Sequence, residues 1–287
     1  MSPQPYRLHR LQRLASAGLL ACVALAGCVA DHPFEAGVSS DFRAKRILRT
    51  ELRPADAPYG AADLARAFQD IVFSYEFHFQ NGQIVDRPIA KPLKRWVGTV
   101  RYGLTGDAVD TADHATVAAL FSRIAPLTGL RFEETSDSPD MLITIATNRG
   151  QEDISDMLAE TGQHTYRERY DLWRRTPGWV CGATLSSSSE DPNRLIQAHV
   201  FIDAETRGLH RQSCLHEEIV QSLGLTNDSD RARPSIFNDD QEFALLTAHD
   251  EALLAVLYSP ELEPGASAEQ ARPVARRLFE QMFGKSP

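Results

Sequence analysis

A histidine and two glutamates stand side by side in the segment SCLHEEIVQSLGLTND, residues 213–228. His216 followed by Glu217 begins like the helix of a zinc protease, in which a second His one helical turn later completes the metal-binding pair. Val220 occupies that position and has no group that binds metal. On a helical wheel His216 falls among the apolar residues of the segment, so we expect it on the core side of a helix.

A second pattern appears when the register moves by one residue. The offsets 0, 1, 4, 7 and 10 then hold Glu217, Glu218, Gln221, Gly224 and Asn227. These are the offsets of HExxHxxGxxH, and in this register the segment resembles the metzincin branch of the zinc metallopeptidases. By that resemblance Glu217, Gln221 and Asn227, or the adjacent Asp228, replace the three metal-binding histidines. Glu218 keeps the general-base position and Gly224 keeps the turn.

The surroundings extend this resemblance over residues 92–260. RPSIFND, residues 233–239, stands where metzincins have the Met-turn, a segment that closes under the metal. Its residues at the corresponding positions are Ser235, Ile236 and Phe237, with Phe237 in place of the Met. The whole pattern also resembles a family of bacterial lipoproteins of unknown function labelled DUF2927. The resemblance implies a zincin-like (metzincin-type) fold with a site helix, a Met-turn-like loop and a C-terminal helix.

Replacement of all three histidines changes the chemistry that such a site could support. In an active relative three neutral imidazoles hold Zn²⁺, which lowers the pKa of a bound water to about 7 so that a glutamate can take its proton. The carboxylates and amides of Glu217, Gln221, Asn227 and Asp228 are hard oxygen ligands. Zinc is therefore not expected, weak binding of Ca²⁺ or Mg²⁺ is the alternative, and no cofactor is expected.

Three hypotheses account for this helix. The favoured one is a non-catalytic, metzincin-like domain, a pseudo-peptidase that binds an extended peptide or an envelope protein, with QAHVFID, residues 197–203, as the exposed strand edge. The alternative is a metallopeptidase-like hydrolase that binds a metal through Glu217, Gln221 and Asp228. Glu218 would then be the catalytic general base, its pKa raised by the neighbouring Glu217. A third, structural interpretation has the polar face of the helix hydrogen-bond the Met-turn-like loop in place of a metal.

The elements that position these residues predict an α+β fold with a mixed β-sheet packed on two long helices. Helices are predicted over residues 61–75 and 111–127, the second ended by Gly129, with a turn at residues 80–83. His249, in the first turn of a later helix, is expected in solvent. Strands are predicted over residues 95–104, 130–134, 140–147, 179–185 and 195–203. Residues 140–147 are nearly all apolar and are expected at the centre of the sheet.

The N-terminus resembles an export signal with three arginines before an apolar run, residues 14–26. The run ends in LAGC at Cys28, which resembles the lipobox of bacterial lipoproteins, where cleavage precedes the Cys and its thiol is acylated. Val29 follows, and by resemblance to the lipoprotein sorting rule the chain is expected in the bacterial cell envelope, anchored in the outer membrane on its periplasmic face. An ordinary secretory signal is the alternative.

The charge balance and the cysteines restrict the partners and the compartment. Removal of the signal with its three arginines leaves 27 basic and 39 acidic residues, a net charge of −12 against −9 for the whole chain, so nucleic acid is not expected as a partner. Cys22 leaves with the signal and Cys28 carries the lipid, so Cys181 and Cys214 are expected to form a disulfide. The expected divisions are the signal peptide (1–27), a lipidated tether (28–60), an N-terminal helix and arm (61–91), the metzincin-like domain (92–260) and a C-terminal tail or helix (261–287).

Overall fold

The computed structural model describes residues 48–238 and 240–284, so the expected signal peptide and Cys28 lie outside the described residues. Within them the chain forms seven α-helices and two β-sheets. In chain order the elements are α2 (Ala61–Val72), β1 (Ser74–Gln80), β2 (Gln83–Ala90), β3 (Thr99–Thr105), α3 (Thr111–Thr128), β4 (Arg131–Glu134), β5 (Met141–Ala146), α4 (Asn148–Glu160), α5 (His164–Arg175), β6 (Cys181–Ser187), β7 (Leu195–Asp203), α6 (Gly208–Gln221), α7 (Ala248–Leu257) and α8 (Ala268–Gly284). The predicted α+β class is confirmed.

The larger sheet has five strands in the order β4-β3-β5-β7-β6. β3 pairs in parallel with β4 and β5, and β5 pairs in parallel with β7, whereas β6 runs antiparallel to β7. The apolar strand predicted at the centre of the sheet is β5, which lies third of the five. Its buried residues include Met141, Ile143 and Ile145, as expected for a parallel strand covered on both faces.

The expectation that residues 197–203 form the exposed strand edge is wrong. These residues belong to β7, which lies between β5 and β6, and the edge strand is β6. The sequences explain the difference, because β7 buries every residue from Ala198 to Ile202, all apolar except His199, and so needs cover on both sides. The shorter and more polar CGATLSS of β6 is better suited to the edge of the sheet.

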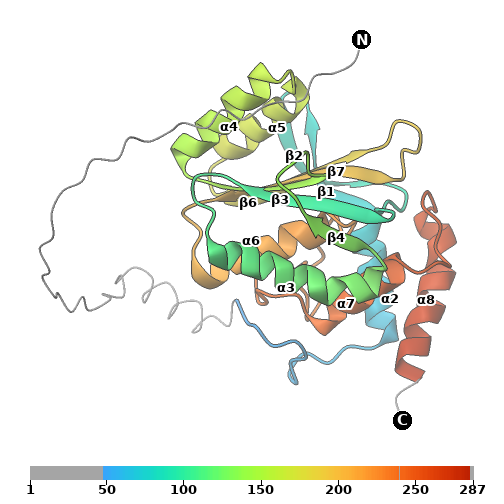
Figure 1. The fold of residues 1–287 in the computed structure, drawn as a ribbon. Helices are drawn as coiled ribbons and strands as arrows, with labels where there is room; N and C mark the ends of the chain where they lie inside the picture. The colour runs from blue at the N-terminus through green and yellow to red at the C-terminus, as the bar shows by residue number, and fades with distance from the viewer. Residues whose placement is uncertain (1–47, 239, 285–287) are drawn as a thin grey trace, which may run out of the picture.

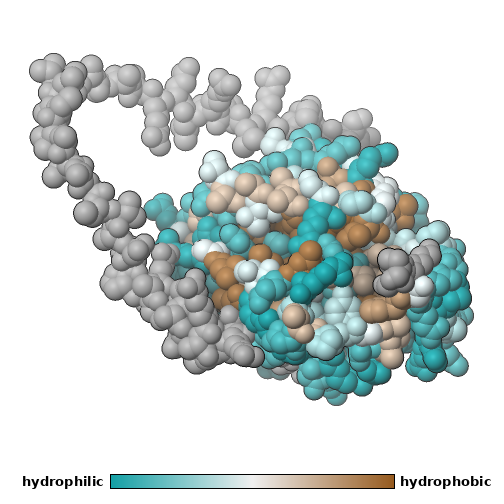
Figure 2. All heavy atoms as spheres, turned by 90° about the horizontal axis from the view of Figure 1, so that it is seen from below, coloured by the Kyte–Doolittle hydropathy of each residue, from teal (hydrophilic) through white to brown (hydrophobic). Residues whose placement is uncertain are grey.

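Helices cover both faces of this sheet. α4 and α5 lie over one face, and α3, α6 and α7 lie over the other (Figure 1). Leu158, Tyr170 and Trp173 of the first pair pack with Phe201 of β7 in a small aromatic cluster. The main core lies beneath the sheet, between β3, β5 and β7 and the helices α2, α3, α6, α7 and α8. Figure 2 shows the molecule from the side of these helices, with hydrophobic residues in separate areas between hydrophilic ones.

The smaller sheet is a hairpin of β1 and β2. The turn predicted at residues 80–83 is present, and Asn81 and Gly82 there have φ values of 51° and 70°, the left-handed conformations that a tight hairpin turn requires. The helix predicted through residue 75 ends at Val72, and the chain enters β1 at Ser74. The hairpin therefore replaces the last part of the predicted helix.

The two ends of the described chain pack together. Phe68 of α2 lies edge-to-face against Phe279 of α8, with ring centroids 5.8 Å apart, and both are fully buried. α8 continues through Pro273 because Ala271, Ala275 and Phe279 line one buried face, which outweighs the hydrogen bond that proline removes. The C-terminal helix is thus part of the main core.

Candidate functional site

The helix α6 carries the segment in which the two glutamates stand. It ends at Gln221, and the chain turns away at Gly224, whose φ is 119°. A Cβ at this position would lie 2.6 Å from the carbonyl oxygen of Lys94, so only glycine fits the turn. This close approach gives a physical reason for the glycine of the sequence pattern.

His216 lies on the core side of α6, as the helical wheel predicts. Its side chain is buried, and Nδ1 accepts a hydrogen bond from the backbone N–H of Leu246 at 3.0 Å. Burial lowers the pKa of His216 to about 4, so the ring is neutral at physiological pH. His216 is therefore a structural residue that fixes the segment before α7.

The polar face of α6 forms the floor of a cavity of about 230 Å³. Glu217, Glu218 and Gln221 line it from the helix, and Asp228 lines it from the loop that follows. The structure thus brings four of the predicted site residues together. A fifth polar residue, Glu76 of β1, faces the same cavity and is not part of the sequence pattern. His210 also lines the cavity, and burial lowers its pKa.

Glu218 is the most deeply buried carboxyl group of this cluster, with 6% of its surface exposed. Its Oε2 atom has no hydrogen-bonding partner among the described residues. Burial raises the pKa of Glu218 well above its usual value, and the nearby Glu217, Glu76 and Asp228 raise it further. A carboxyl group in this environment is costly to ionise, which is common at functional sites.

Glu76 reaches the site from the hairpin. Its Oε2 accepts a hydrogen bond from Nε2 of Gln221 at 3.2 Å, and its backbone N–H donates to the carbonyl of Thr226 at 3.0 Å. The alternation of SYEFHFQ, residues 74–80, is the only sequence signal that could have placed this Glu on a strand. Nothing local shows that the strand lies beside α6.

Asn227 does not join the cluster. Its Nδ2 donates to the backbone carbonyl of Asp70 at 3.1 Å and to that of Asp228 at 2.6 Å, so this side chain bonds the end of α2 rather than the cavity. Gln221 is held by Glu76. The amides of Gln221 and Asn227 are thus engaged in hydrogen bonds, and the other polar groups are carboxylates. This set of ligands does not match the imidazoles that zinc prefers. Within the described ranges no group of three or more His, Cys, Asp or Glu side chains is arranged to hold a metal ion.

The Met-turn-like loop passes beside the cavity. Ile236 lines the cavity, while Ser235 and Phe237 are buried behind it. The buried carboxylate of Asp250 in α7 fixes the loop, because it accepts hydrogen bonds from Ser235 Oγ at 2.5 Å and from the backbone N–H of Ile236 at 3.3 Å. The buried carboxylate of Asp250 therefore organises this loop.

The cavity continues into a second one of about 300 Å³. Both are lined by Glu76, Phe77 and Gln221, so together they form one groove. The residues of β1 from Tyr75 to Phe79 form one wall of the second cavity, and Ala183, Thr184 and Leu185 of β6 form the other. We call this space between β1 and β6, with α6 as its floor, the β6 groove.

Among the described residues no strand pairs with the outer edge of β6, which faces this groove and is called its free edge. The backbone N–H of Asp203 donates to the carbonyl of Val180 at 2.8 Å, and Cys181 pairs with Ile202. In an antiparallel pair every second residue points its N–H and C=O to the partner strand. Val180, Gly182 and Thr184 therefore bond β7. The backbone groups of Cys181, Ala183 and Leu185 point the other way, along the wall of the groove.

A disulfide joins the wall of the groove to its floor. Cys181 at the start of β6 is bonded to Cys214 of α6, with Cα atoms 5.8 Å apart, so the predicted pairing is confirmed. Both cysteines line the first cavity. The bridge fixes the edge strand beside Glu217 and Glu218.

The N-terminal strap, residues 48–60, closes one end of the first cavity. Leu48 lines the cavity, and its backbone N–H donates to the carbonyl of Gln241 at 2.8 Å. The backbone N–H of Arg49 donates to the carbonyl of Glu242 at 2.6 Å, and the carbonyl of Arg49 accepts from the N–H of Ala244 at 2.8 Å. The strap thus pairs with the segment that follows the Met-turn-like loop.

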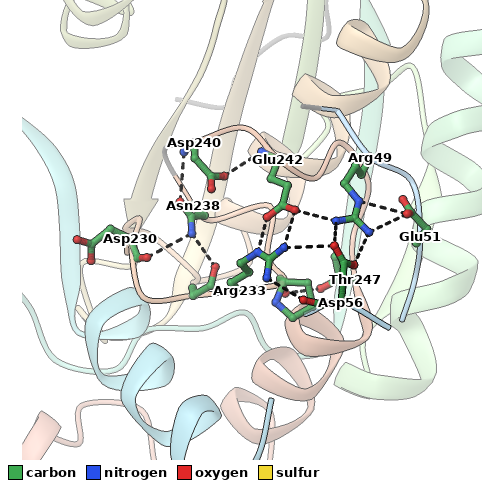
Figure 3. A network of polar contacts seen from close by, with 11 residues as sticks. Arg49, Glu51, Asp56, Asp230, Arg233, Asn238, Asp240, Glu242 and Thr247 are labelled. Atoms are coloured by element: carbon green, nitrogen blue, oxygen red, sulfur yellow. Dashed lines mark hydrogen bonds and ion pairs between the residues drawn. The ribbon is translucent and has the colours of Figure 1, made fainter. Parts of the chain in front are cut away.

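Two arginines hold the strap in a network of ion pairs (Figure 3). Arg49 Nη1 donates to Glu242 Oε1 at 2.8 Å, and its guanidinium also contacts Glu51 and Asp56. Arg233 donates to both carboxylate oxygens of Glu242, from Nε at 2.5 Å and from Nη2 at 2.8 Å. Arg233, followed by Arg49, lowers the pKa of Glu242, so the carboxylate stays ionised despite its burial.

The comparisons with known proteins give a family and no activity. The profile of the family DUF2927, described as a protein of unknown function, matches residues 61–277. No curated protein matches the chain with significant similarity. In the part of the chain that the structure describes, no helix is both long enough and apolar enough to cross a membrane.

Proposed function

Because the chain belongs to the DUF2927 family, whose function is unknown, we propose from its geometry that it binds an extended peptide segment in the β6 groove. The observation that carries this proposal is the free edge of β6, whose outward N–H and C=O groups at Ala183 and Leu185 line an open cavity. An extended peptide that adds to such an edge forms a regular ladder of main-chain hydrogen bonds. The adjacent cavities would then receive alternate side chains of the peptide.

The groove also has the composition of a peptide site. Phe77 and Trp179, with ring centroids 4.9 Å apart, supply apolar surface beside the carboxylates of α6. The disulfide and the strap hold the groove in place, so a ligand would meet a formed surface. The resemblance to metzincin-type zincins supports the same interpretation, since their substrate groove also offers a strand edge to an extended peptide.

Binding without cleavage is the form of this function that we favour. The residues at the three histidine positions do not fit zinc, as Asn227 bonds α2 and Gln221 bonds Glu76. We also propose that the chain acts as a pseudo-peptidase module in the bacterial cell envelope, anchored through Cys28 in the outer membrane. The sequence of the N-terminus supports this location.

A retention assay tests the binding function. An N-acetylated, C-amidated degenerate nonapeptide library is passed over the immobilised full chain, and retained peptides are quantified. Ala183→Pro removes an outward N–H while leaving the bonds to β7, since proline is tolerated on the open side of an edge strand. Ala183→Ser keeps that N–H and is the matched control. Retention by the wild type and Ala183→Ser, lost in a folded Ala183→Pro, is expected; equal retention by all three contradicts pairing with β6.

A metal-dependent hydrolase is the second candidate, because Glu218 combines deep burial with a raised pKa in a cavity. In that case Glu217, Gln221 and Asp228 would hold the ion and Glu218 would be the base. Elemental analysis and a peptide-cleavage assay of the purified chain test it. A stoichiometric ion together with cleavage that Glu218→Gln abolishes would favour the hydrolase; absence of both leaves the binding module.

A further inference from the structure

We propose that the first cavity of the β6 groove takes a cationic side chain, Lys or Arg, from the bound peptide. This inference rests on the proposed peptide-binding function and names the kind of segment that the groove selects. A strand added to β6 would direct alternate side chains to the face of the sheet that α6 covers. Cys181, bonded to Cys214 of α6, and Ala183, packed against the main core, already point to this face, and the first cavity lies there.

The charge of the cavity is the first observation. Glu76, Glu217, Glu218 and Asp228 line it, and no Lys or Arg is among the described residues that do so. Burial lowers the pKa of His210, which disfavours a positive charge on its ring. Acidic side chains gathered around a partly enclosed space favour a cationic side chain there over an acidic one.

The state of Glu218 is the second and independent observation. More than nine-tenths of this residue is buried, it lines the cavity, and its Oε2 has no hydrogen-bonding partner among the described residues. An acceptor buried without a donor costs free energy, whereas a charge-assisted hydrogen bond from an ammonium or guanidinium group satisfies it. A donor supplied by the ligand would complete the site.

The dimensions and walls of the cavity fit one side chain. Its volume of about 230 Å³ is below the range of cavities that hold whole small molecules. Phe77, Trp179 and Ile236 provide apolar contacts for the aliphatic part of a Lys or Arg, and Glu217 and Glu218 lie at the floor on α6. An acidic side chain would supply no charge-assisted donor to Glu218 Oε2, and a short neutral polar side chain would not cover the apolar walls.

The composition of the peptides retained by the full chain tests the inference. In the degenerate nonapeptide library we expect Lys and Arg to be enriched about tenfold over Glu at one position, the ratio that one charge-assisted hydrogen bond supplies. Glu218→Gln should reduce this enrichment severalfold. Glu133→Gln, on the exposed edge strand β4 at the other side of the sheet, is the matched control and should leave it unchanged.

A further variant tests whether the cationic side chain comes from a peptide in solution or from the protein's own N-terminal segment. Arg43, Lys45 and Arg46 precede Leu48, which lines the cavity, so these three residues are replaced by Ala in one variant. If this variant retains peptides enriched in Lys and Arg and the wild type retains none, the protein's own segment is the cationic ligand of the wild type. The inference then stands. If the wild type and the triple variant both retain peptides without enrichment of Lys or Arg, the inference is overturned. The proposed peptide-binding function would still hold. Loss of retention in every background overturns the function itself.

Discussion

Gln221 of α6 donates a hydrogen bond from Nε2 to Oε2 of Glu76 in β1, at a distance of 3.2 Å. This contact joins two segments that are 145 residues apart in the chain and connects the floor of the β6 groove to its wall. It also engages the amide of Gln221, the residue that the resemblance to zinc proteases aligns with a metal ligand. The polar face of α6 is therefore part of a groove assembled by tertiary contacts.

Replacement of the ionisable carboxyl of Glu218 by an amide should stabilise the fold at neutral pH. The pKa of this carboxyl is raised in the folded state, so its ionisation above the usual pKa of about 4.5 favours the unfolded chain. We expect Glu218→Gln to increase the free energy of unfolding by about 1–3 kcal/mol at pH 8 and by much less at pH 4. Chemical denaturation at the two pH values measures the difference. A destabilised variant, or an equal gain at both pH values, would contradict the assignment.

Buried histidines should make the protein sensitive to acid. Burial lowers the pKa of both His199 and His216 to about 4, whereas the unfolded chain binds these protons near pH 6.5. Stability should therefore fall as the pH decreases from about 6.5 to about 4, by up to about 1.4 kcal/mol per pH unit for each histidine. His216→Gln, whose amide oxygen can still accept from Leu246, should remove one such contribution from the slope. An unchanged slope would show that His216 is protonated in the fold.

Reduction of the disulfide should weaken the groove and the fold together. The Cys181–Cys214 bridge closes a loop with a sequence separation of 33 residues, for which the chain-entropy relation gives about 3–4 kcal/mol. We expect the Cys181→Ser/Cys214→Ser double variant to lose about this much stability and to bind the peptide library more weakly. Denaturation with and without reductant checks the stability, and the double variant should not respond to reductant. A wild type insensitive to reductant would contradict the prediction.

Loss of Arg233 should loosen the N-terminal strap. Among the described residues, Arg233→Met leaves the buried Glu242 with Arg49 as its cationic partner, and the change should cost about 1–3 kcal/mol at pH 7. Because Arg233 lowers the pKa of Glu242, this cost should be present above the usual pKa of about 4.5 and decrease as the pH falls below it. Limited proteolysis should then cut the strap faster. Arg276→Met, which removes an exposed i,i+4 pair with Glu280, serves as the control and should change stability by less than about 0.5 kcal/mol.

Local sequence signals predicted the elements well where each element is determined by its own residues. α3 begins at Thr111, where Asp110 caps its first turn, and it stops at Gly129, close to the predicted bounds. The strand predicted over residues 195–203 coincides with β7. Capping residues, hydrophobic periodicity and a C-terminal glycine determine a helix through neighbouring positions in the chain. They can therefore be recognised in a single sequence.

Features that depend on distant segments were not predictable in this way. His249, expected in solvent, is buried because Tyr59 of the strap packs edge-on against its ring, with centroids 5.1 Å apart. Ile71, Val72 and Tyr75 keep helical spacing across the point where α2 ends and β1 begins. For this reason the sequence predicted a longer helix and no β1–β2 hairpin. Glu76 could not be assigned to the site for the same reason, since only the tertiary fold places β1 beside α6.

Hydrogen exchange of the backbone amides in β6 tests the central claim most directly. Peptides selected from the library are added to the full chain, and exchange rates are measured by NMR. The N–H groups of Ala183 and Leu185, which point away from β7, should become protected, while those of Gly182 and Thr184, already bonded to β7, should change little. Protection at Ala183 and Leu185, with or without protection of the outward N–H of Cys181, and little change at Gly182 and Thr184 is the result that we predict. Saturating peptide without protection there, or protection confined to another surface, would contradict binding at the free edge of β6.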